Sequence, residues 1–444
     1  ANSPYFNTVP KHDYNVGYDF NHESDATRNM RNIIFSYWLQ EFNVDGYRFD
    51  LSKGYTQTNT LGDVGLWGQY DATRIAIWKD IADVLYAVEE DAILILEHFA
   101  VNTEEEELSD YGFLLWGNSN YNYAQGTMGY TGSDINWMSY VARGWSDPHV
   151  MGYMESHDEE RLMYKNLTFG NSGNPDYNVK YLPVALSRME LAGAFFFTIP
   201  GPKMIWQFGE LGYDISIDYG CRVCNKPVLW NYYDIASRLR INQVWSELIK
   251  LKTTYPAFSS TSFILNVAGS GKRINLNNDE MNVTVIGNFD VYNASVNPNF
   301  QHTGFWYEYF SGDSINVSNI SATINLLPGE YRLYTDVRLN TPEIIISIEE
   351  LASAMQHELL VSPNPSGNLF NLSAELPTSG EVAISIYNLK GELVFEDDII
   401  SNAGAFNYTW SGNTTDGSAI PTGTYLCKMQ TAAGVYLAKL MKVQ

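Results

Sequence analysis

The chain has 444 residues, of which 45% are hydrophobic and 18% are charged, and this composition predicts two or three globular domains with sizeable cores. The formal net charge of −24 argues against nucleic acid and anionic membranes as partners, because binding to phosphates needs clustered Lys and Arg. The sequence holds no long uncharged apolar run, so we expect no membrane-spanning helix.

The first 255 residues alternate short apolar strands with amphipathic helices, a pattern typical of parallel β/α architecture. We expect five strands, which begin near residues 45, 93, 111, 150 and 203. Helices are predicted near residues 24–41, 70–88, 134–143, 182–197 and 234–252. A further helix is predicted to begin at Thr103, with the glutamates at 104–107 on a solvated face near its positive end.

The chain contains three cysteines, which bear on disulfide formation and metal binding. Cys221 and Cys224 form a C-x-x-C sequence in a Gly-rich loop, and Cys427 lies near the C-terminus. A zinc site would need two more ligands nearby, and none is evident, so we expect a local disulfide or free thiols.

The pattern changes near Pro256 to short alternating strands separated by turn residues. We predict a catalytic β/α region over 1–255, an antiparallel β-sandwich over 256–340, a linker over 341–358 and a second small β-sandwich over 359–444. The predicted fold class is therefore α/β followed by all-β.

Three carboxylates, Asp50, Glu97 and Asp158, lie at or just beyond the ends of predicted strands. In a β/α barrel the carboxyl ends of the strands share one face, so side chains far apart in sequence converge there. Cleavage of a glycosidic bond requires such convergence, because one carboxyl group protonates the leaving oxygen while another attacks or stabilises the sugar carbon.

The residue types suggest roles for the three acids. Arg48 lies two residues before Asp50, and a positive neighbour keeps a carboxylate ionised, which suits a nucleophile. Glu97 ends a wholly aliphatic strand, a setting that raises a carboxyl pKa and suits a general acid. Asp158, beside His157, is the candidate for holding sugar hydroxyls.

Four segments resemble the α-amylase family, glycoside hydrolase family thirteen. Residues 46–53, the strand that ends at Glu97 and residues 155–158 resemble its second, third and fourth conserved segments, and residues 201–210 resemble a later segment on the eighth barrel strand. The resemblance implies a (β/α)8 barrel in which Asp50 is the nucleophile, Glu97 the general acid/base and Asp158 the transition-state stabiliser. It also implies that Arg48 supports the nucleophile, and that Arg48, Lys53, His157 and Arg161 bind substrate.

The chain departs from this family at its beginning. The family's first conserved segment and the first three strands are missing, so we expect a partial TIM barrel with strands four to eight, incomplete at the N-terminus. The family often binds calcium, and Gly54 stands where a histidine often supplies its backbone oxygen. Asp19 and Asn21 are candidate further ligands, because calcium prefers carboxylate and carbonyl oxygens. Calcium is thus the candidate cofactor, and no organic cofactor is expected.

The final residues resemble the C-terminal sorting domain of the type IX secretion system of Bacteroidetes. The resemblance lies in residues 362–365, 384–391, 420–425 and 439–443. It implies the secretion machinery as a partner and an extracellular or cell-surface location. The alternative is a generic β-sandwich such as a carbohydrate-binding module. For the sandwich over 256–340, we favour a structural role over contact with glycan.

The leading hypothesis is a secreted, retaining α-glucan hydrolase that cleaves α-1,4 bonds of starch-like or glycogen-like polysaccharide. A transglycosylase of the same family is the first alternative, because water and a sugar hydroxyl compete for the same covalent intermediate. The second is a non-catalytic glycan-binding protein on a decayed barrel.

Overall fold

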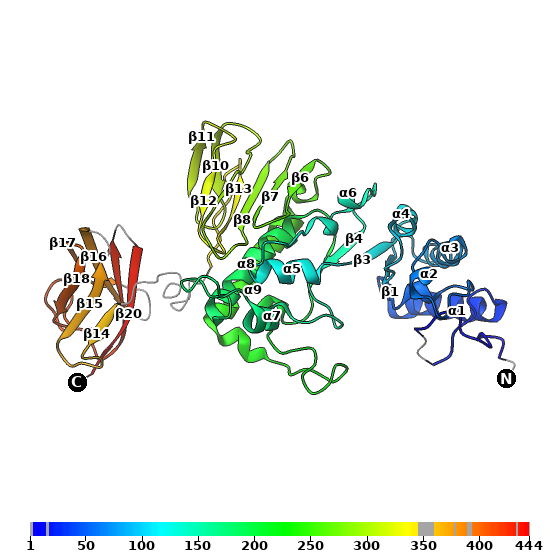
Figure 1. Ribbon diagram of the computed structural model, residues 1–444, viewed down its shortest axis with the longest axis horizontal. Helices are drawn as coiled ribbons and strands as arrows, with labels where there is room; N and C mark the ends of the chain where they lie inside the picture. Colours follow the sequence, from blue (N-terminus) through cyan, green and yellow to red (C-terminus); the bar gives the residue numbers. More distant parts are fainter. Residues whose placement is uncertain are drawn as a thin grey trace. The chain divides into compact units, whose positions relative to one another are not determined.

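The computed structural model describes residues 3–14, 17–344, 359–376, 379–388, 393–431 and 434–443. The chain divides into two compact units, one comprising Ala1–Asp234 with Ile241–Ile344 and the other comprising Ile235–Arg240 with Ile345–Gln444 (Figure 1). Most of the predicted linker, residues 345–358, lies outside the described residues.

A five-stranded parallel sheet forms the centre of the first unit. Its strands follow one another in chain order: β1 (Gly46–Phe49), β2 (Ile93–Leu96), β3 (Leu114–Asn118), β4 (Val150–Tyr153) and β5 (Lys203–Met204). Each neighbouring pair is parallel, so all five carboxyl ends point to the same edge. The five predicted strands are confirmed and form part of a barrel, whereas their numbering as strands four to eight stays a prediction.

Helices precede the first strand of this sheet, separate its successive strands and follow the last one. They are α1 (Asp25–Phe42), α2 (Val64–Trp67), α3 (Ala72–Tyr86), α4 (Asn102–Asp110), α5 (Asn120–Thr127), α6 (Tyr140–Arg143), α7 (Leu162–Phe169), α8 (Leu182–Thr198) and α9 (Ala236–Thr254). Helix α3 shows the packing, because Ile75, Trp78 and Ile81 recur at helical spacing and are buried in one cluster with Leu94 and Leu96 of β2. The helix predicted over 134–143 is shorter than expected, since a 3-10 turn, Asn136–Met138, precedes α6.

An antiparallel β-domain follows within the predicted range 256–340. Its strands are β6 (Phe263–Asn266), β7 (Gly271–Leu276), β8 (Val283–Asn288), β9 (Ala294–Val296), β10 (Gly304–Glu308), β11 (Ser314–Val317), β12 (Ile324–Leu326) and β13 (Tyr331–Thr335). Six strands pair in the order β11-β10-β13-β8-β7-β6, and β12 pairs with β9. This domain packs closely on α8. A Cβ added at Gly287 of β8 would lie only 2.5 Å from the Phe195 ring of α8, so a side chain has no room there.

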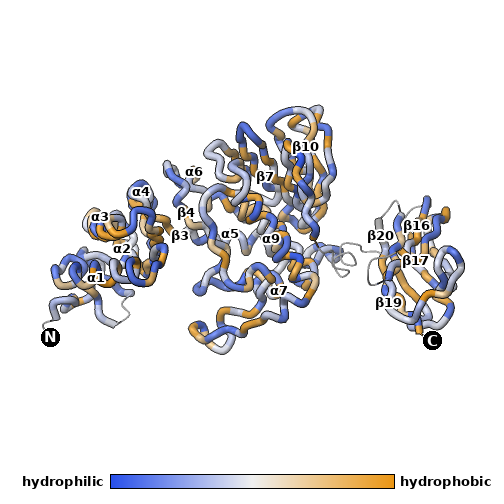
Figure 2. The backbone as a smooth tube through the Cα atoms, turned by 180° about the vertical axis from the view of Figure 1, so that it is seen from behind, coloured by the Kyte–Doolittle hydropathy of each residue, from blue (hydrophilic) through white to orange (hydrophobic). Residues whose placement is uncertain are grey.

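The second unit carries the C-terminal β-sandwich. Its strands are β14 (Leu360–Ser362), β15 (Phe370–Leu376), β16 (Gly380–Asn388), β17 (Leu393–Ser401), β18 (Gly404–Trp410), β19 (Gly423–Thr431) and β20 (Gly434–Lys442). They form two sheets, β14-β15-β18 and β17-β16-β19-β20. Alternate residues such as Val382, Ile384 and Ile386 face the buried core, and the strands accordingly carry hydrophobic segments in Figure 2.

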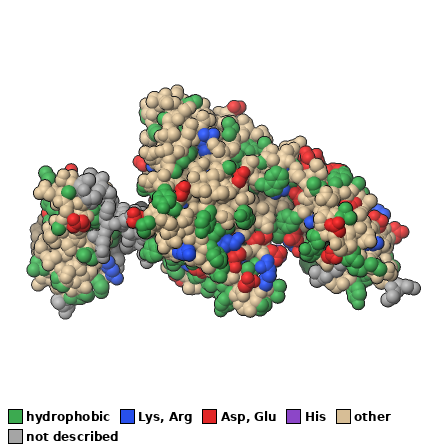
Figure 3. Space-filling view, in the orientation of Figure 1, with side chains coloured by type: hydrophobic (Ala, Val, Ile, Leu, Met, Phe, Trp, Pro, Cys, Tyr) green, Lys and Arg blue, Asp and Glu red, His purple; other side chains and the backbone are tan. Residues whose placement is uncertain are grey.

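Charged side chains are scattered over the surface. On the face shown in Figure 3, acidic and basic side chains lie among hydrophobic side chains and other atoms. Among the described residues, no helix has both the length and the apolar character needed to cross a membrane.

Candidate active site

Two of the three predicted catalytic acids meet on one guanidinium group. Arg48, on β1, places Nη1 2.5 Å from Asp50 Oδ1 and Nη2 3.0 Å from Glu97 Oε2. Strands β1 and β2 are neighbours in register, with Phe49 opposite Leu96, so the residues that follow them leave the sheet side by side. The Asp50 side chain is 74% exposed and that of Glu97 is 14% exposed. One carboxylate is therefore open to solvent while the other is largely covered.

The turn after Asp50 is held in an unusual backbone conformation. Leu51 has a φ of +46°, a left-handed conformation that is uncommon for a residue with a branched side chain. In this position the Leu51 N–H donates to Glu97 Oε2 at 2.9 Å, and the Ser52 N–H donates to the Glu97 carbonyl at 3.0 Å. The conformational cost is thus offset by hydrogen bonds that fix the two strand ends to each other.

The environment of Glu97 favours its protonated form. Burial is the largest effect and raises the pKa of Glu97, and the nearby Asp50 raises it further through charge and a hydrogen bond. The Leu51 N–H and Arg48 act in the opposite direction without cancelling the increase. A carboxyl group with a raised pKa keeps its proton to higher pH than an ordinary glutamate, which is the property that a general acid needs.

Asp158 and His157 follow β4 on the same edge of the sheet. His157 Nε2 lies 3.3 Å from Asp158 Oδ2, and both side chains are about half exposed, at 45% and 56%. The Asp158 N–H donates to Ser156 Oγ at 3.1 Å, which fixes the backbone on one side of the residue. The Asp158 carboxylate is therefore presented to solvent from an ordered turn.

Arg161 lies beneath this turn. Only 2% of Arg161 is exposed, and its Nη1 donates to the carbonyls of Ser156 and Glu159 at 2.5 and 2.9 Å. A buried guanidinium that holds two backbone carbonyls supports the loop from below. This placement favours a positioning role for Arg161 over the predicted contact with substrate.

An aromatic side chain that the sequence analysis did not select connects the two parts of the site. Trp116, on β3, lies under Arg48, whose Cζ is 4.0 Å from the ring centroid, and its ring is 6.2 Å from that of His157. Cation–π contact with an indole holds a guanidinium in place. In the sequence, the position of Trp116 near the carboxyl end of the central strand could have indicated a role in the site. No acidic residue there identified this strand end as functional.

Lys53 is committed to contacts within the protein. Its Nζ donates to the Phe99 carbonyl at 3.0 Å and lies 4.3 Å from the centroid of the Trp67 ring. Burial lowers the pKa of Lys53. Binding of substrate by Lys53, as by Arg48 and His157, stays a prediction.

The prediction of a solvated glutamate face on α4 is wrong for two of its four members. Glu104 and Glu105 are buried, at 0% and 4% exposure, because each accepts a hydrogen bond from a buried arginine. Arg74 Nε lies 2.6 Å from Glu104 Oε1, and Arg143 Nη1 lies 3.0 Å from Glu105 Oε2. Such partners come from other elements and cannot be read from the glutamate run itself.

Glu104 also supports the residues next to the candidate acids. Its Oε1 lies 2.7 Å from His98 Nε2, and His98 Nδ1 lies 2.9 Å from Ser52 Oγ. Burial would raise the pKa of Glu104, but hydrogen bonds from His98 and Arg74 lower it overall. The buried chain from Arg74 to Ser52 thus fixes the turn that follows Asp50.

The candidate calcium ligands have other partners. Asp19 Oδ2 accepts hydrogen bonds from Asn7 Nδ2 at 2.8 Å and from the Lys11 N–H at 3.0 Å, and Asn21 Oδ1 accepts from two backbone N–H groups of the following turn. Gly54 packs against His12, since a Cβ added at Gly54 would lie 2.9 Å from His12 Nε2. The described residues contain no group of three or more His, Cys, Asp or Glu side chains arranged to hold a metal ion. The oxygens of Asp19 and Asn21 thus have hydrogen-bond partners within the chain, and calcium binding stays a prediction.

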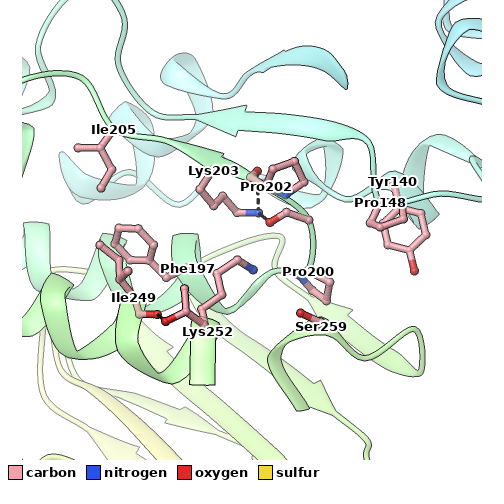
Figure 4. Close-up of a pocket in the computed structure, with 12 residues that line it drawn as sticks. Tyr140, Pro148, Phe197, Pro200, Pro202, Lys203, Ile205, Ile249, Lys252 and Ser259 are labelled. Carbon is pink, nitrogen blue, oxygen red and sulfur yellow. Dashed lines mark hydrogen bonds between the residues drawn. The ribbon is translucent and has the colours of Figure 1, made fainter. Parts of the chain in front are cut away.

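A separate pocket of about 570 Å³ lies away from these residues (Figure 4). It is bordered by Pro148, Gly201 and Pro202, which precede β4 and β5, and by Phe197 of α8 and Ile249 of α9. The candidate acids follow their strands, whereas Pro148, Gly201 and Pro202 at this pocket precede theirs, and none of the candidate acids lines it. It is therefore distinct from the candidate active site.

The parallel sheet and the antiparallel β-domain of the first unit have counterparts among solved structures. The structure is similar to that of the α-amylase from Geobacillus thermoleovorans complexed with acarbose, with a TM-score of 0.54 and 14% identity, over 74% of this chain and 71% of that chain. It is also similar to an Anoxybacillus α-amylase, with a TM-score of 0.53 and 13% identity, over 72% of this chain and 64% of that chain. At this level of identity, the similarity shows the fold.

The sequence comparison finds relatives of a second kind. The 1,4-alpha-glucan branching enzyme GlgB of Bacillus cereus is 23% identical over 241 residues, which cover 50% of this chain and 34% of that protein. The chain thus spans about a third of the length of the curated relatives it matches. In the second unit, residues 366–434 match the FlgD Ig-like domain.

Proposed function

We propose that this chain carries the catalytic acids of a retaining, α-glucan-active glycoside hydrolase. The observation that carries the proposal is the contact of one guanidinium, that of Arg48, with both Asp50 and Glu97. Asp50 is also near enough to Glu97 to raise its pKa through a hydrogen bond. Retaining glycosidases need their two carboxyl groups only about 5 Å apart, because one of them attacks the sugar directly.

The reaction follows from the properties of each group. Glu97 donates its proton to the glycosidic oxygen, and Asp50 attacks the anomeric carbon as the bond to that oxygen breaks. The product of this step is a glycosyl ester on Asp50. Glu97, now ionised, removes a proton from water, which attacks the anomeric carbon and releases Asp50. Asp158 holds sugar hydroxyls during both steps.

Hydrolysis is the leading reaction because the fold is shared with α-amylases. Transglycosylation is the second candidate, and the specific observation in its favour is that the curated relatives are named branching enzymes. The two reactions differ only in the acceptor that attacks the glycosyl ester. The substrate in both is an α-1,4-glucan such as starch or glycogen.

Proton NMR of the full-length gene product acting on amylose tests the proposal. Hydrolysis releases new reducing ends that first appear in the α configuration, whereas branching produces α-1,6 anomeric signals with few new reducing ends. A first product in the inverted configuration would exclude the glycosyl ester. Binding to amylose without turnover would favour the non-catalytic glycan-binding alternative.

We further propose that residues 359–444 form a sorting domain for type IX secretion, which would place the protein outside the cell or on its surface. The support is the resemblance of residues 362–365, 384–391, 420–425 and 439–443 to that domain. The match to an Ig-like domain over 366–434 agrees with a β-sandwich and is neutral about its role.

A further inference from the structure

The loop after β5 reaches the turn that carries Asp158. Cys221 and Cys224 form a disulfide within the tip of this loop, residues 219–226, where both cysteines are exposed. Between the two cysteines, Arg222 extends from this loop, and its Nη2 donates a hydrogen bond to the Asp158 carbonyl. The backbone of Asp158 is thus held on both sides, by Ser156 Oγ at its N–H and by Arg222 at its carbonyl.

The interior of this loop is organised around Lys226. The Lys226 Nζ donates to the carbonyls of Cys221 and Cys224 at 2.7 and 2.9 Å, and to those of Tyr219 and Arg222 at 3.3 and 3.4 Å. An ammonium group has three protons, so four carbonyls around it saturate its donors. The disulfide and this ammonium group together fix the backbone from which Arg222 extends.

The base of the same loop has an independent attachment. Ser216 Oγ donates to Glu160 Oε2 at 2.7 Å, and the Ile217 N–H donates to Glu160 Oε1 at 2.9 Å. These contacts do not involve the disulfide. Opening the disulfide would therefore remove one of the two restraints on the tip of the loop, which carries Arg222, while the Lys226 hydrogen bonds and the attachment of the base next to Asp158 remain.

We propose that Arg222 is a positioning residue for Asp158 and that the Cys221–Cys224 disulfide keeps it in place. Arg222 is exposed, and an exposed arginine loses side-chain entropy when it is held in one geometry, so its contact depends on a fixed backbone. The inference rests on the proposed function of Asp158. A displacement of about 1 Å in a group that contacts substrate can reduce a rate by up to about a hundredfold.

The redox step needs a dithiol as reductant. The dithiol donates two electrons, the Sγ–Sγ bond breaks, each sulfur of Cys221 and Cys224 gains one proton, and the dithiol becomes a cyclic disulfide. Both cysteines are exposed, so the reductant can reach them. Cys427 is buried, with its pKa raised by burial to about 12, and it should not react.

The first test measures kcat and KM of the full-length gene product on soluble starch, before and after treatment with dithiothreitol. We expect reduction to lower kcat roughly tenfold with a smaller change in KM. The double variant C221S/C224S should match the reduced enzyme and show no further response to dithiothreitol. Arg222→Ala should give a similar loss and Arg222→Lys a partial recovery, because an ammonium group can still donate to the Asp158 carbonyl. Arg28→Ala, which removes an exposed arginine paired with Asp80, serves as the matched control.

The second test does not depend on activity. Hydrogen–deuterium exchange of peptides covering 155–161 should become faster on reduction and in Arg222→Ala, whereas peptides from β1 and β2 should be unchanged. Unchanged exchange in 155–161 would overturn the proposal even if the enzyme turns over starch. Faster exchange together with an enzyme that never acts on α-glucans would keep the positioning role of Arg222 and reject the proposed function instead.

Discussion

The amide of Leu51 donates a hydrogen bond to the carboxylate of Glu97 across a distance of 2.9 Å. This bond joins the residue directly after one candidate acid to the other candidate acid, although the two residues follow different strands. It explains why a left-handed turn is retained at Leu51, since an extended backbone would direct its N–H elsewhere. The relative position of Asp50 and Glu97 is therefore built into the backbone as well as into their shared arginine.

Replacing Asp50 with asparagine removes the nucleophile and leaves the shape of the side chain almost unchanged. We expect the kcat of the full-length gene product on soluble starch to fall by at least about a thousandfold, because the covalent step has no substitute. Release of reducing sugar measures the effect. Asp45→Asn, an exposed acid just before β1, is the control and should retain activity. Equal activity in Asp50→Asn and the wild type would show that the nucleophile is wrongly assigned.

Replacing Arg48 with methionine should move the alkaline limb of the pH–activity profile. Arg48 lowers the pKa of Glu97, so its removal raises that pKa and keeps the general acid protonated to higher pH. The maximal rate should nevertheless fall, because Asp50 loses its positive neighbour at 2.5 Å. Profiles of kcat against pH measure both effects, with Arg28→Met as control. A limb that stays in place or moves to lower pH would contradict the assignment of Glu97 as the acid.

The buried carboxyl group of Glu155 should make the stability of the folded protein depend on pH. Burial raises the pKa of Glu155 to about 7, with Leu162 N–H and Arg161 opposing the shift. Between about pH 4.5 and 7 the folded state holds a proton that the unfolded state has released, so stability falls as pH rises through this window. The Glu155→Gln side chain stays neutral and can still accept a hydrogen bond from the Leu162 N–H. As pH rises through this window, the free energy of unfolding of the variant should therefore fall by roughly 3 kcal/mol less than that of the wild type.

Guanidinium unfolding at pH 5 and pH 8 measures the change in Glu155→Gln. Exposed Glu90→Gln is the matched control and should leave the pH dependence as it is in the wild type. A variant that loses as much stability as the wild type between the two pH values would show that Glu155 is not the source. Glu105, whose pKa burial also raises to about 7, would then be the next residue to test.

Deleting residues 359–444 should separate secretion from catalysis. In a host that has the type IX machinery, we expect the shortened protein to be retained inside the cell with its activity on starch preserved, because the candidate acids all lie in the first unit. Immunoblots of cell and medium fractions, with activity assays on each, measure the outcome. Normal secretion of the shortened protein would refute the sorting assignment, and impaired binding to starch would favour a carbohydrate-binding module.

The order of the strands and the candidate acids could be predicted from the sequence. Apolar runs such as residues 93–96, followed directly by Glu97, combine a hydrophobic pattern with a local motif, and both are readable along the chain. Parallel strands then bring their ends to one edge, so the proximity of Asp50 to Glu97 could be expected before any coordinates.

The residues that support those acids could not be predicted, because they depend on tertiary contacts. Trp116 beneath Arg48, Arg74 beside Glu104 and Arg222 on the Asp158 carbonyl are contacts between elements that are remote along the chain. Nothing in the local pattern of one segment specifies the side chain that another segment brings to it, because burial and hydrogen bonding depend on packing in three dimensions. For the same reason, two of the four glutamates that were predicted to be solvated are buried, because arginines from other elements pack against them.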